Sequence, residues 1–498
     1  MRTVMKHLAA RVRCWCLLLL SFPAVYLAGG GMLAAAQTPA PQEPAASTAA
    51  GSPVIRVNVR QVLVPVVVTD AKGHHVPGLK QSDFVVTEDG VPQEIAAFRV
   101  AADTLPSEVD QPGQADSHPS ANASKGVQAA GPVSAANAGS GAGAVRRTYL
   151  ICVDTLHSAF QNFGRVKEAV YKVLRQEQGS TDSQYALIAL GRELHVVQDS
   201  TQDAAAVAAA VRSKSFQKLI QDSEAASSAI AVQQFTGLMR NYCSACGCES
   251  NGAASSGEMG ECPSIKSMVK GALLSFGERS YGLNQTFLRQ LAEVVKATAA
   301  MPTTRTVIFI SDGFNRIPGR ELYSILQGFQ PRDHSFEFSP RDNGPDIENI
   351  LKLATRYDVK FYTLDSRGLY SSAFSPGNTF SAGSTFSTNT QMDSRSAPSE
   401  ATATTESIDS NTSSAARENT DAMAELARET GGLFFENSND LGKGVARALA
   451  DAREYYVLAY VPKNEALNGA YRKIVVTLKD AEKKYHVNAK AGYWATRE

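Results

Sequence analysis

The sequence has 498 residues, which is too long for one small hydrophobic core, so two or three domains are expected. Its 49 basic and 49 acidic residues cancel, so the chain lacks the excess positive charge on which nucleic-acid binding depends. After residue 36 no run of about 18 apolar residues occurs, which argues against a later membrane span.

The N-terminal segment 1–36 has the pattern of a signal peptide. Four basic residues precede an apolar run from Cys14 to about Gly29, and three alanines before Gln37 offer a cleavage site. Cleavage would leave 45 basic and 49 acidic residues, a formal charge of −4. The mature chain would then be secreted, or lie in the periplasm or cell envelope. The alternative is an uncleaved anchor, because the apolar run extended to Ala36 could just span a bilayer.

Two flexible segments flank a short strand-rich unit. Residues 37–53 are rich in Ala, Pro, Ser and Thr and are expected to form a tether, and residues 101–146 a similar linker. Between them, residues 54–100 alternate apolar and polar positions, as in a small antiparallel unit. The C-terminal residues 455–498 also contain three strand patterns without a core of their own. We therefore predict that both ends of the chain join in one β-sandwich.

Residues 147–454 alternate apolar strands with helices, which predicts an α/β fold with a doubly wound, mostly parallel sheet. The apolar run Tyr149 to Val153 predicts the central strand, and it ends at Asp154. A hairpin over 185–197 is expected to add an antiparallel edge. Residues 371–417, rich in Ser, Thr and Asn, are expected to be mobile. The remaining predicted strands are residues 306–310, 359–364 and 433–435.

Four cysteines cluster within residues 243–262 of this domain. In an oxidising compartment such a cluster most simply forms two disulfides, with three possible connectivities. The alternative is a zinc site with four thiolates, although the paired C-x-x-C spacing of familiar structural sites is missing. Cys152 is expected to be a small hydrophobe in the buried strand. The four clustered residues are Cys243, Cys246, Cys248 and Cys262.

Oxygen-bearing residues follow two of the predicted central strands. Asp154 is followed by Ser158, and Ser311-Asp312-Gly313 comes after the strand at 306–310. Because carboxyl ends of parallel strands meet at one edge, these residues are expected in the crevice where open α/β sheets bind ligands. The sequences DTLHS and SDGFN, with the strand order, resemble a von Willebrand factor type A domain over about residues 147–453. The flanking strand segments resemble exported von Willebrand-type proteins of soil bacteria, an acidobacterial-type group.

The resemblance implies a magnesium site completed by a carboxylate of the partner. It assigns Ser158 as a direct ligand, Asp154 to the first shell or next to it, and Asp312 to contact through water, with Thr286 as the threonine from a later loop. Leu156 stands at the first serine position of the family pattern D-x-S-x-S, so the site is degenerate. In the alternative interpretation, Asp154 and Ser158 only cap the following helix and satisfy loop amides.

These features predict a non-enzymatic binding or adhesion-type module that captures a protein or surface ligand bearing a carboxylate. One alternative is a metal-free envelope scaffold that uses the cysteine loop as its contact surface. Another is a hydrolase using Ser158 or Ser311 with a histidine, although the chain has no G-x-S-x-G elbow. No glycine-rich phosphate loop follows the first strand, which argues against nucleotide binding. His157 and the pair His74-His75 are expected to be solvated, and Asp365 to add charge to the crevice.

Overall fold

The computed structural model describes residues 61–100, 146–221, 223–248, 262–333, 335–336, 341–369, 419–479 and 485–496. The predicted signal peptide, the tether, the 371–417 segment and nearly all of the linker lie outside these residues. All described residues belong to one compact unit, Val59–Glu498. Among them, no helix combines the length and the apolar character that a membrane crossing needs.

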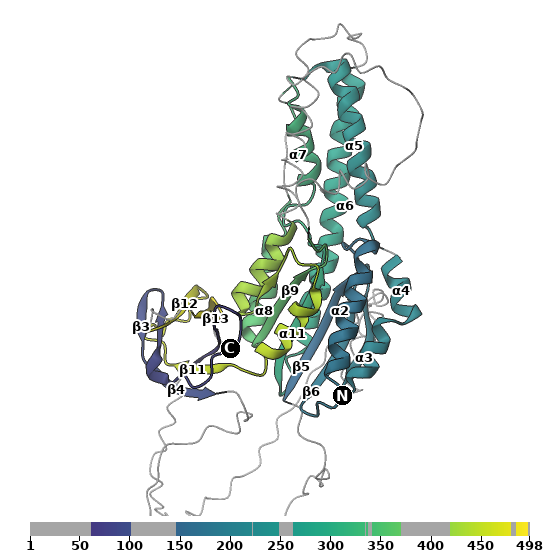
Figure 1. Cartoon of the computed structure of the whole chain (residues 1–498). Helices are drawn as coiled ribbons and strands as arrows, with labels where there is room; N and C mark the ends of the chain where they lie inside the picture. The colour runs from purple at the N-terminus through teal and green to yellow at the C-terminus, as the bar shows by residue number, and fades with distance from the viewer. Residues whose placement is uncertain are drawn as a thin grey trace, which may run out of the picture. The chain divides into compact units, whose positions relative to one another are not determined.

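A six-stranded sheet forms the centre of the α/β part (Figure 1). Its strands are β5 (Arg147–Asp154), β6 (Ser183–Leu190), β7 (Leu194–Thr201), β8 (Thr304–Ser311), β9 (Val359–Asp365) and β10 (Phe434–Phe435). They lie in the order β10-β9-β8-β5-β6-β7, and all pairings are parallel except that of β6 with β7. The predicted doubly wound sheet with an antiparallel edge, as in a von Willebrand type A-like fold, is thus confirmed. From β5 the chain continues to β6 on one side and later to β8 on the other, so the strand order reverses between β5 and β8. Open α/β sheets bind ligands at the carboxyl ends of strands at such a point, which we call the crevice.

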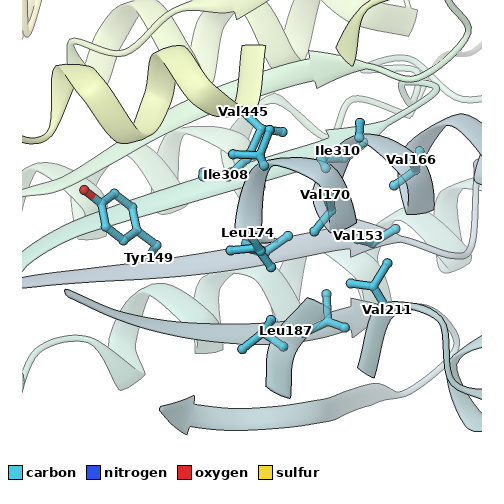
Figure 2. Packing of buried hydrophobic residues seen from close by; sticks show 14 of the residues in the cluster. Tyr149, Val153, Val166, Val170, Leu174, Leu187, Val211, Ile308, Ile310 and Val445 are labelled. Atoms are coloured by element: carbon cyan, nitrogen blue, oxygen red, sulfur yellow. The ribbon is translucent and has the colours of Figure 1, made fainter. Parts of the chain in front are cut away.

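Helices cover both faces of this sheet because side chains alternate along its buried strands. On β5, Tyr149, Ile151 and Val153 face one apolar cluster, whereas Leu150 and Cys152 face the other. Figure 2 shows the first cluster, in which a helical stripe of valines and a leucine packs on the strands. The helices of that face are α2 (Phe163–Gln176), α3 (Ala204–Val211), α4 (Lys214–Gln221) and α11 (Leu441–Asp451). The other face is covered by α6 (Cys262–Ala297), α8 (Gly344–Arg356) and a helix over residues 419–430.

A further helical layer has an apolar core of its own. It comprises α5 (Ala225–Cys246), the first half of α6 and α7 (Arg320–Phe329), which lie together in Figure 1. We call this layer the cysteine-tied helices, because one disulfide joins the end of α5 to the start of α6 and a second one closes the turn that follows α5. The structure pairs Cys243 with Cys248 and Cys246 with Cys262. Neither the disulfide pairing nor α7 was predicted from the sequence.

Strands from both ends of the chain form the predicted β-sandwich. One sheet has the order β13-β1-β11-β4 and the other β14-β12-β2-β3, and a single apolar cluster lies between them. All pairings that the structure describes within these sheets are antiparallel. The first sheet contains β1 (Val62–Thr69), β4 (Ile95–Val100), β11 (Tyr456–Tyr460) and β13 (His486–Ala489). The second contains β2 (Phe84–Glu88), β3 (Val91–Gln93), β12 (Tyr471–Leu478) and β14 (Gly492–Trp494), with a short 3-10 helix η1 (Gln81–Asp83) before β2.

Candidate functional site

The carboxyl edge of the six-stranded sheet brings three of the predicted site residues together. Asp154 ends β5 and is fully buried, and Asp312 directly follows β8. The hydroxyl of Ser158 accepts a hydrogen bond of 3.1 Å from the backbone N–H of Asp312. The loop after β5 therefore lies against the loop after β8, as the parallel arrangement of the strands requires.

Asp154 is surrounded by hydrogen-bond donors of the chain itself. Its Oδ1 accepts the backbone N–H groups of Leu156 and His157, both at 2.9 Å. Its Oδ2 accepts the His157 ring nitrogen Nδ1 at 3.0 Å and the Ser311 hydroxyl at 2.6 Å. A carboxylate offers about four lone-pair positions, and four donors occupy them. Asp154 therefore organises the turn after β5, as the capping interpretation anticipated.

Both ring nitrogens of His157 lie within hydrogen-bond distance of a side-chain oxygen. Nδ1 faces the Asp154 carboxylate, and Nε2 lies 2.9 Å from Oδ1 of Asn284. The side-chain amide of Asn284 is oriented by its Nδ2, which donates to the carbonyl of Asn315 at 2.8 Å, so its oxygen faces the histidine. Two acceptors on two ring nitrogens correspond to an imidazolium. Burial is the largest influence and opposes this charge, but Asp154, Asn284 and Glu321 together raise the pKa of His157 above its ordinary value.

Asp312 is held by three donors from two segments, the one after β5 and the one after β9. Its Oδ2 accepts the backbone N–H of Ala159 at 2.8 Å and the side-chain amide of Asn162 at 2.7 Å, and its Oδ1 accepts the Ser366 hydroxyl. Asn162 ends the short 3-10 helix η2 (Phe160–Asn162). Burial raises the pKa of the Asp312 carboxyl above its ordinary value, although these donors oppose the shift.

Gly313 allows the loop after β8 to turn sharply beside Asp312. Its φ of 95° lies in the left-handed region, and a Cβ there would come within 2.5 Å of the Asn419 carbonyl oxygen. The N–H of Phe314 donates to that same carbonyl at 2.8 Å. A side chain at this position would therefore push the start of the 419–430 helix away from the crevice.

Arginines surround the buried acids at this edge. Arg165 on α2 donates to three uncharged oxygens, which are Oδ1 of Asn162 at 2.6 Å, the carbonyl of Arg367 at 2.5 Å and Oδ1 of Asn439 at 3.3 Å. The guanidinium of Arg367 pairs with Asp365, the last residue of β9, at 2.8 Å. Asp365 is thus paired with Arg367, two residues later, and its side chain is buried.

A second arginine group lies on the other side of the loop after β5. The N–H of Glu224 donates to the carbonyl of Leu156 at 2.8 Å, which places this acid beside the crevice. The Glu224 side chain is only 6% exposed and pairs with both Arg192 and Arg279, whose side chains are 57% and 59% exposed. The charges at the surface here are therefore positive, with the shared carboxylate beneath them.

Three predictions about individual residues need correction. Thr286 does not join the site, because its hydroxyl donates to the carbonyl of Gly282 one turn earlier on α6. Asn284, two positions before it, faces the crevice instead, since residues two apart on a helix point in different directions. His157 is not a solvated surface residue, because its side chain is 16% exposed. His75 is likewise largely enclosed, at 14% exposure, and its Nε2 lies 2.8 Å from the buried carboxylate of Asp451, whereas His74 is 75% exposed.

Sequence reasoning missed four polar residues that complete the crevice. Asn315 ends the SDGFN motif that contains Asp312, whereas the others form no motif with Asp154 or Asp312; the four come from η2, α6 and the loops after β8 and β9. The asparagine in the turn SAFQN before α2 was a usable signal, because such residues often bond to nearby loops. The four residues are Asn162, Asn284, Asn315 and Ser366.

The arrangement of these donors does not fit a magnesium ion. Mg²⁺ requires near-octahedral oxygen ligation at close range. All lone-pair positions of Asp154 point at donors of the chain, Leu156 is 1% exposed in the apolar core, and Thr286 bonds to its own helix. Only Ser158 and Asp312 of the predicted ligands would retain oxygen lone pairs for an ion. Within the described residues, no group of three or more His, Cys, Asp or Glu side chains is placed to hold a metal.

Comparison with known proteins gives no family assignment. No family model matches the chain, and no curated protein matches it. Among solved structures, it is similar to an aerotolerance-related membrane protein from Bacteroides fragilis NCTC 9343, with 12% identity over 61% of this chain and 98% of that chain, at a TM-score of 0.27. Similar values hold for the conserved hypothetical protein BatB from Bacteroides thetaiotaomicron, with 10% identity, 61% and 98% coverage and a TM-score of 0.25. The open conformation of the pilus adhesin SpaC from Lactobacillus rhamnosus GG has 10% identity, 70% and 44% coverage and a TM-score of 0.22.

Scores this low carry no argument about function. The class of the molecule therefore comes from its own geometry, which is a von Willebrand type A-like α/β sheet with a β-sandwich formed by strands from both ends of the chain. The function is therefore inferred from the side chains at the carboxyl edge of the sheet.

Proposed function

We propose that the protein is an exported, non-enzymatic binding module that captures a carboxylate-bearing protein or surface through the carboxyl edge of its six-stranded sheet. The observation that carries the proposal is the pair Arg192 and Arg279, two exposed guanidinium groups that share one buried carboxylate, Glu224. Guanidinium groups bind carboxylates through two parallel hydrogen bonds, which suits them to recognise acidic partners.

Arg165 extends the same positive surface to the other side of the loop after β5. Its acceptors are uncharged oxygens, so its charge is positioned without being neutralised by them. The buried acids below, Asp154 and Asp365, are paired with His157 and Arg367 respectively. An approaching acidic group would therefore meet arginines before it meets Asp154 or Asp365.

Export is the second part of the proposal. The predicted signal peptide supports it, and so do the two disulfides of the cysteine-tied helices, because disulfides persist in oxidising compartments. A secreted, periplasmic or cell-envelope location follows. We also propose membership in the exported, acidobacterial-type von Willebrand group, on the strength of the β unit before the α/β domain and the short β tail after it.

The test uses the mature chain and immobilised polyglutamate as a carboxylate-bearing probe. Replacing Arg192 by glutamine removes one exposed cation and leaves the Arg279–Glu224 pair in place. Loss of one charge-assisted contact should weaken binding by about tenfold, which corresponds to about 1.4 kcal/mol. Biolayer interferometry at two salt concentrations measures the effect, and Arg165→Gln should act in the same direction.

The matched control is Arg356→Gln. Arg356 is exposed at the end of α8, just before β9 begins, and so lies at the opposite, amino edge of the sheet. This variant removes the same charge and should bind polyglutamate like the wild type. Equal losses in Arg192→Gln and Arg356→Gln would mean that only net charge matters, and the proposal would then fail.

A second candidate is a metal-free envelope scaffold that binds through the cysteine-tied helices. It is favoured by the separate apolar core of that layer and by exposed apolar side chains on it, with Ile230 at 48%, Met268 at 58% and Leu274 at 67% exposure. Reduction of both disulfides separates the two functions. Polyglutamate binding at the carboxyl edge should survive reduction, whereas binding through the cysteine-tied helices should be lost.

The hydrolase alternative would require a serine hydroxyl that donates to a histidine. The Ser311 hydroxyl donates to Asp154 instead, and Ser158 accepts from the backbone of Asp312. Both ring nitrogens of His157 face Asp154 and Asn284. These contacts support the non-enzymatic proposal, and a serine-reactive probe that labels the wild type but not its Ser→Ala variants would contradict it.

A further inference from the structure

We propose that the ring of His157 takes the place of a cation beside Asp154, so that this crevice assembles without a metal ion. The inference goes beyond the binding function above and does not depend on it. The predicted magnesium ligands do not match the observed hydrogen bonds, and the position of His157 accounts for that difference. An internal side chain occupies the hydrogen-bonding position next to the buried carboxylate that an ion would otherwise take.

The first argument is the saturation of Asp154. Two of its four donors are backbone N–H groups of the turn that follows, at residues 156 and 157, and these cannot leave without unfolding the turn. A third donor, Ser311, is the last residue of the central strand β8. A cation could reach the carboxylate only by displacing the imidazole of His157.

The second argument is that this imidazole is fixed in place. Its ring packs edge-on against Phe287, with 4.8 Å between ring centroids, and lies 5.9 Å from the ring of Phe314. Its far nitrogen is held by Asn284, whose own amide is anchored on Asn315. Rotation of the ring out of the crevice would break both hydrogen bonds and leave a void among aromatic side chains.

The third argument concerns Leu156, the residue before His157. Leu156 stands where the family pattern has a serine ligand, and its side chain belongs to the apolar cluster that also contains Phe287 and Phe314. The departure from the pattern at Leu156 and the histidine at the variable position next to it therefore act together. Leucine removes an oxygen ligand and closes the floor of the site, while the neighbouring histidine fills the position next to the carboxylate.

The test measures binding of Mn²⁺ alone, as a paramagnetic substitute for Mg²⁺, to the purified mature chain by electron paramagnetic resonance. The wild type should show no site that depends on Asp154 at millimolar Mn²⁺. His157→Ala removes the ring and exposes one lone-pair position of the Asp154 carboxylate, so it should bind Mn²⁺ at least about tenfold more tightly than the wild type. Adding Asp154→Asn to that variant should abolish the gain. His195→Ala, at an exposed histidine on β7, is the matched control and should behave like the wild type.

A second measurement needs no variant and covers the case in which His157→Ala fails to fold. Nitrogen-15 spectra of the wild-type histidine rings should show both nitrogens of His157 carrying hydrogen, and its resonances should not move when Mg²⁺ is added. Wild-type binding of Mn²⁺ that is lost in Asp154→Asn would overturn the proposal. A folded His157→Ala protein with no gain in Mn²⁺ binding, or Mg²⁺-induced shifts of the His157 ring, would overturn it equally.

Discussion

One carboxylate in the α/β part and one in the β-sandwich are both buried, and different kinds of hydrogen-bond donor stabilise them. Asp154 in the crevice is 0% exposed and accepts two backbone amides, an imidazole and a hydroxyl. Glu88 in the β-sandwich is 2% exposed, and its Oε2 accepts the hydroxyls of Tyr460 at 2.6 Å and Tyr493 at 3.1 Å. Both acids are removed from water, which is costly unless donors replace it.

The difference lies in what the donors can do when the charge is removed. A backbone N–H can only donate, so it demands an acceptor at a fixed place. A tyrosine hydroxyl can rotate and accept a hydrogen bond instead. The Asp154 site is therefore specific for a carboxylate, whereas the Glu88 site should tolerate a neutral amide. Burial alone does not predict how strongly a buried acid is required.

The largest effect is expected for Asp154→Asn. The new amide N–H₂ would face the His157 ring and the Ser311 hydroxyl, so a buried charge loses its partner and a donor meets a donor. We expect a loss of about 3 kcal/mol in the free energy of unfolding, since breaking one side of a buried pair is strongly destabilising. Urea denaturation followed by circular dichroism measures it.

A surface acid provides the control for that measurement. Glu348 on α8 is 53% exposed and pairs with Lys352 one turn later. Exposed pairs of this kind contribute little, so Glu348→Gln should change the free energy of unfolding by less than about 0.5 kcal/mol. If Asp154→Asn were as mild as this control, Asp154 would not organise the crevice as its hydrogen bonds indicate.

A smaller effect is expected for Glu88→Gln. The glutamine oxygen can keep one tyrosine as donor, and the other hydroxyl can turn to accept from the new N–H₂. The expected loss is about 1 kcal/mol, the usual net value of one hydrogen bond. Denaturation under the same conditions checks it. A loss equal to that of Asp154→Asn would remove the distinction between hydroxyl and amide donors.

The smallest change should appear in the reactivity of Cys152, which reports on the central strand below the crevice. Burial raises the pKa of its thiol to about 12, so at pH 8 the group stays protonated as well as inaccessible. Alkylation by iodoacetamide, followed by mass spectrometry of the peptide containing Cys152, should be very slow in the wild type. Glu88→Gln should accelerate it only about fivefold, in line with a loss of about 1 kcal/mol.

Asp154→Asn gives the contrasting result in the same assay. If labelling proceeds through opening of the fold, a loss of about 3 kcal/mol corresponds to an acceleration of more than about 100-fold. Similar rates in the two variants would show that both substitutions destabilise the fold around Cys152 equally. That outcome would contradict a specific role for Asp154 in closing the end of β5.

Local features of the sequence predicted much of the α/β part. The apolar run of β5 and the acid at its end specify a buried strand and the turn that follows, because the amides that bind Asp154 are only two and three residues away. Asn284 could not be found in this way. It is 127 residues from His157, and its helix, not a motif, decides which of its polar residues faces the crevice.

The β-sandwich shows the same limit on a larger scale. Strand patterns at both ends of the chain, each without a core, were sufficient to predict that they pair. The partners of Glu88 were not predictable, because Tyr460 is 372 residues away and Tyr493 is 405 residues away. The register between the paired strands decides such contacts, and the register of strands this far apart cannot be predicted from a single sequence.

The most direct test of the proposed function is to locate bound acid on the molecule by hydrogen–deuterium exchange. Polyglutamate is added to the wild type, and protection is compared between the loops at the carboxyl edge and the cysteine-tied helices. The account predicts protection in the loops after β5, β6 and β8, including the segment around Arg192, with no change in α5 or α7. Protection confined to the cysteine-tied helices would contradict it and would favour the scaffold function.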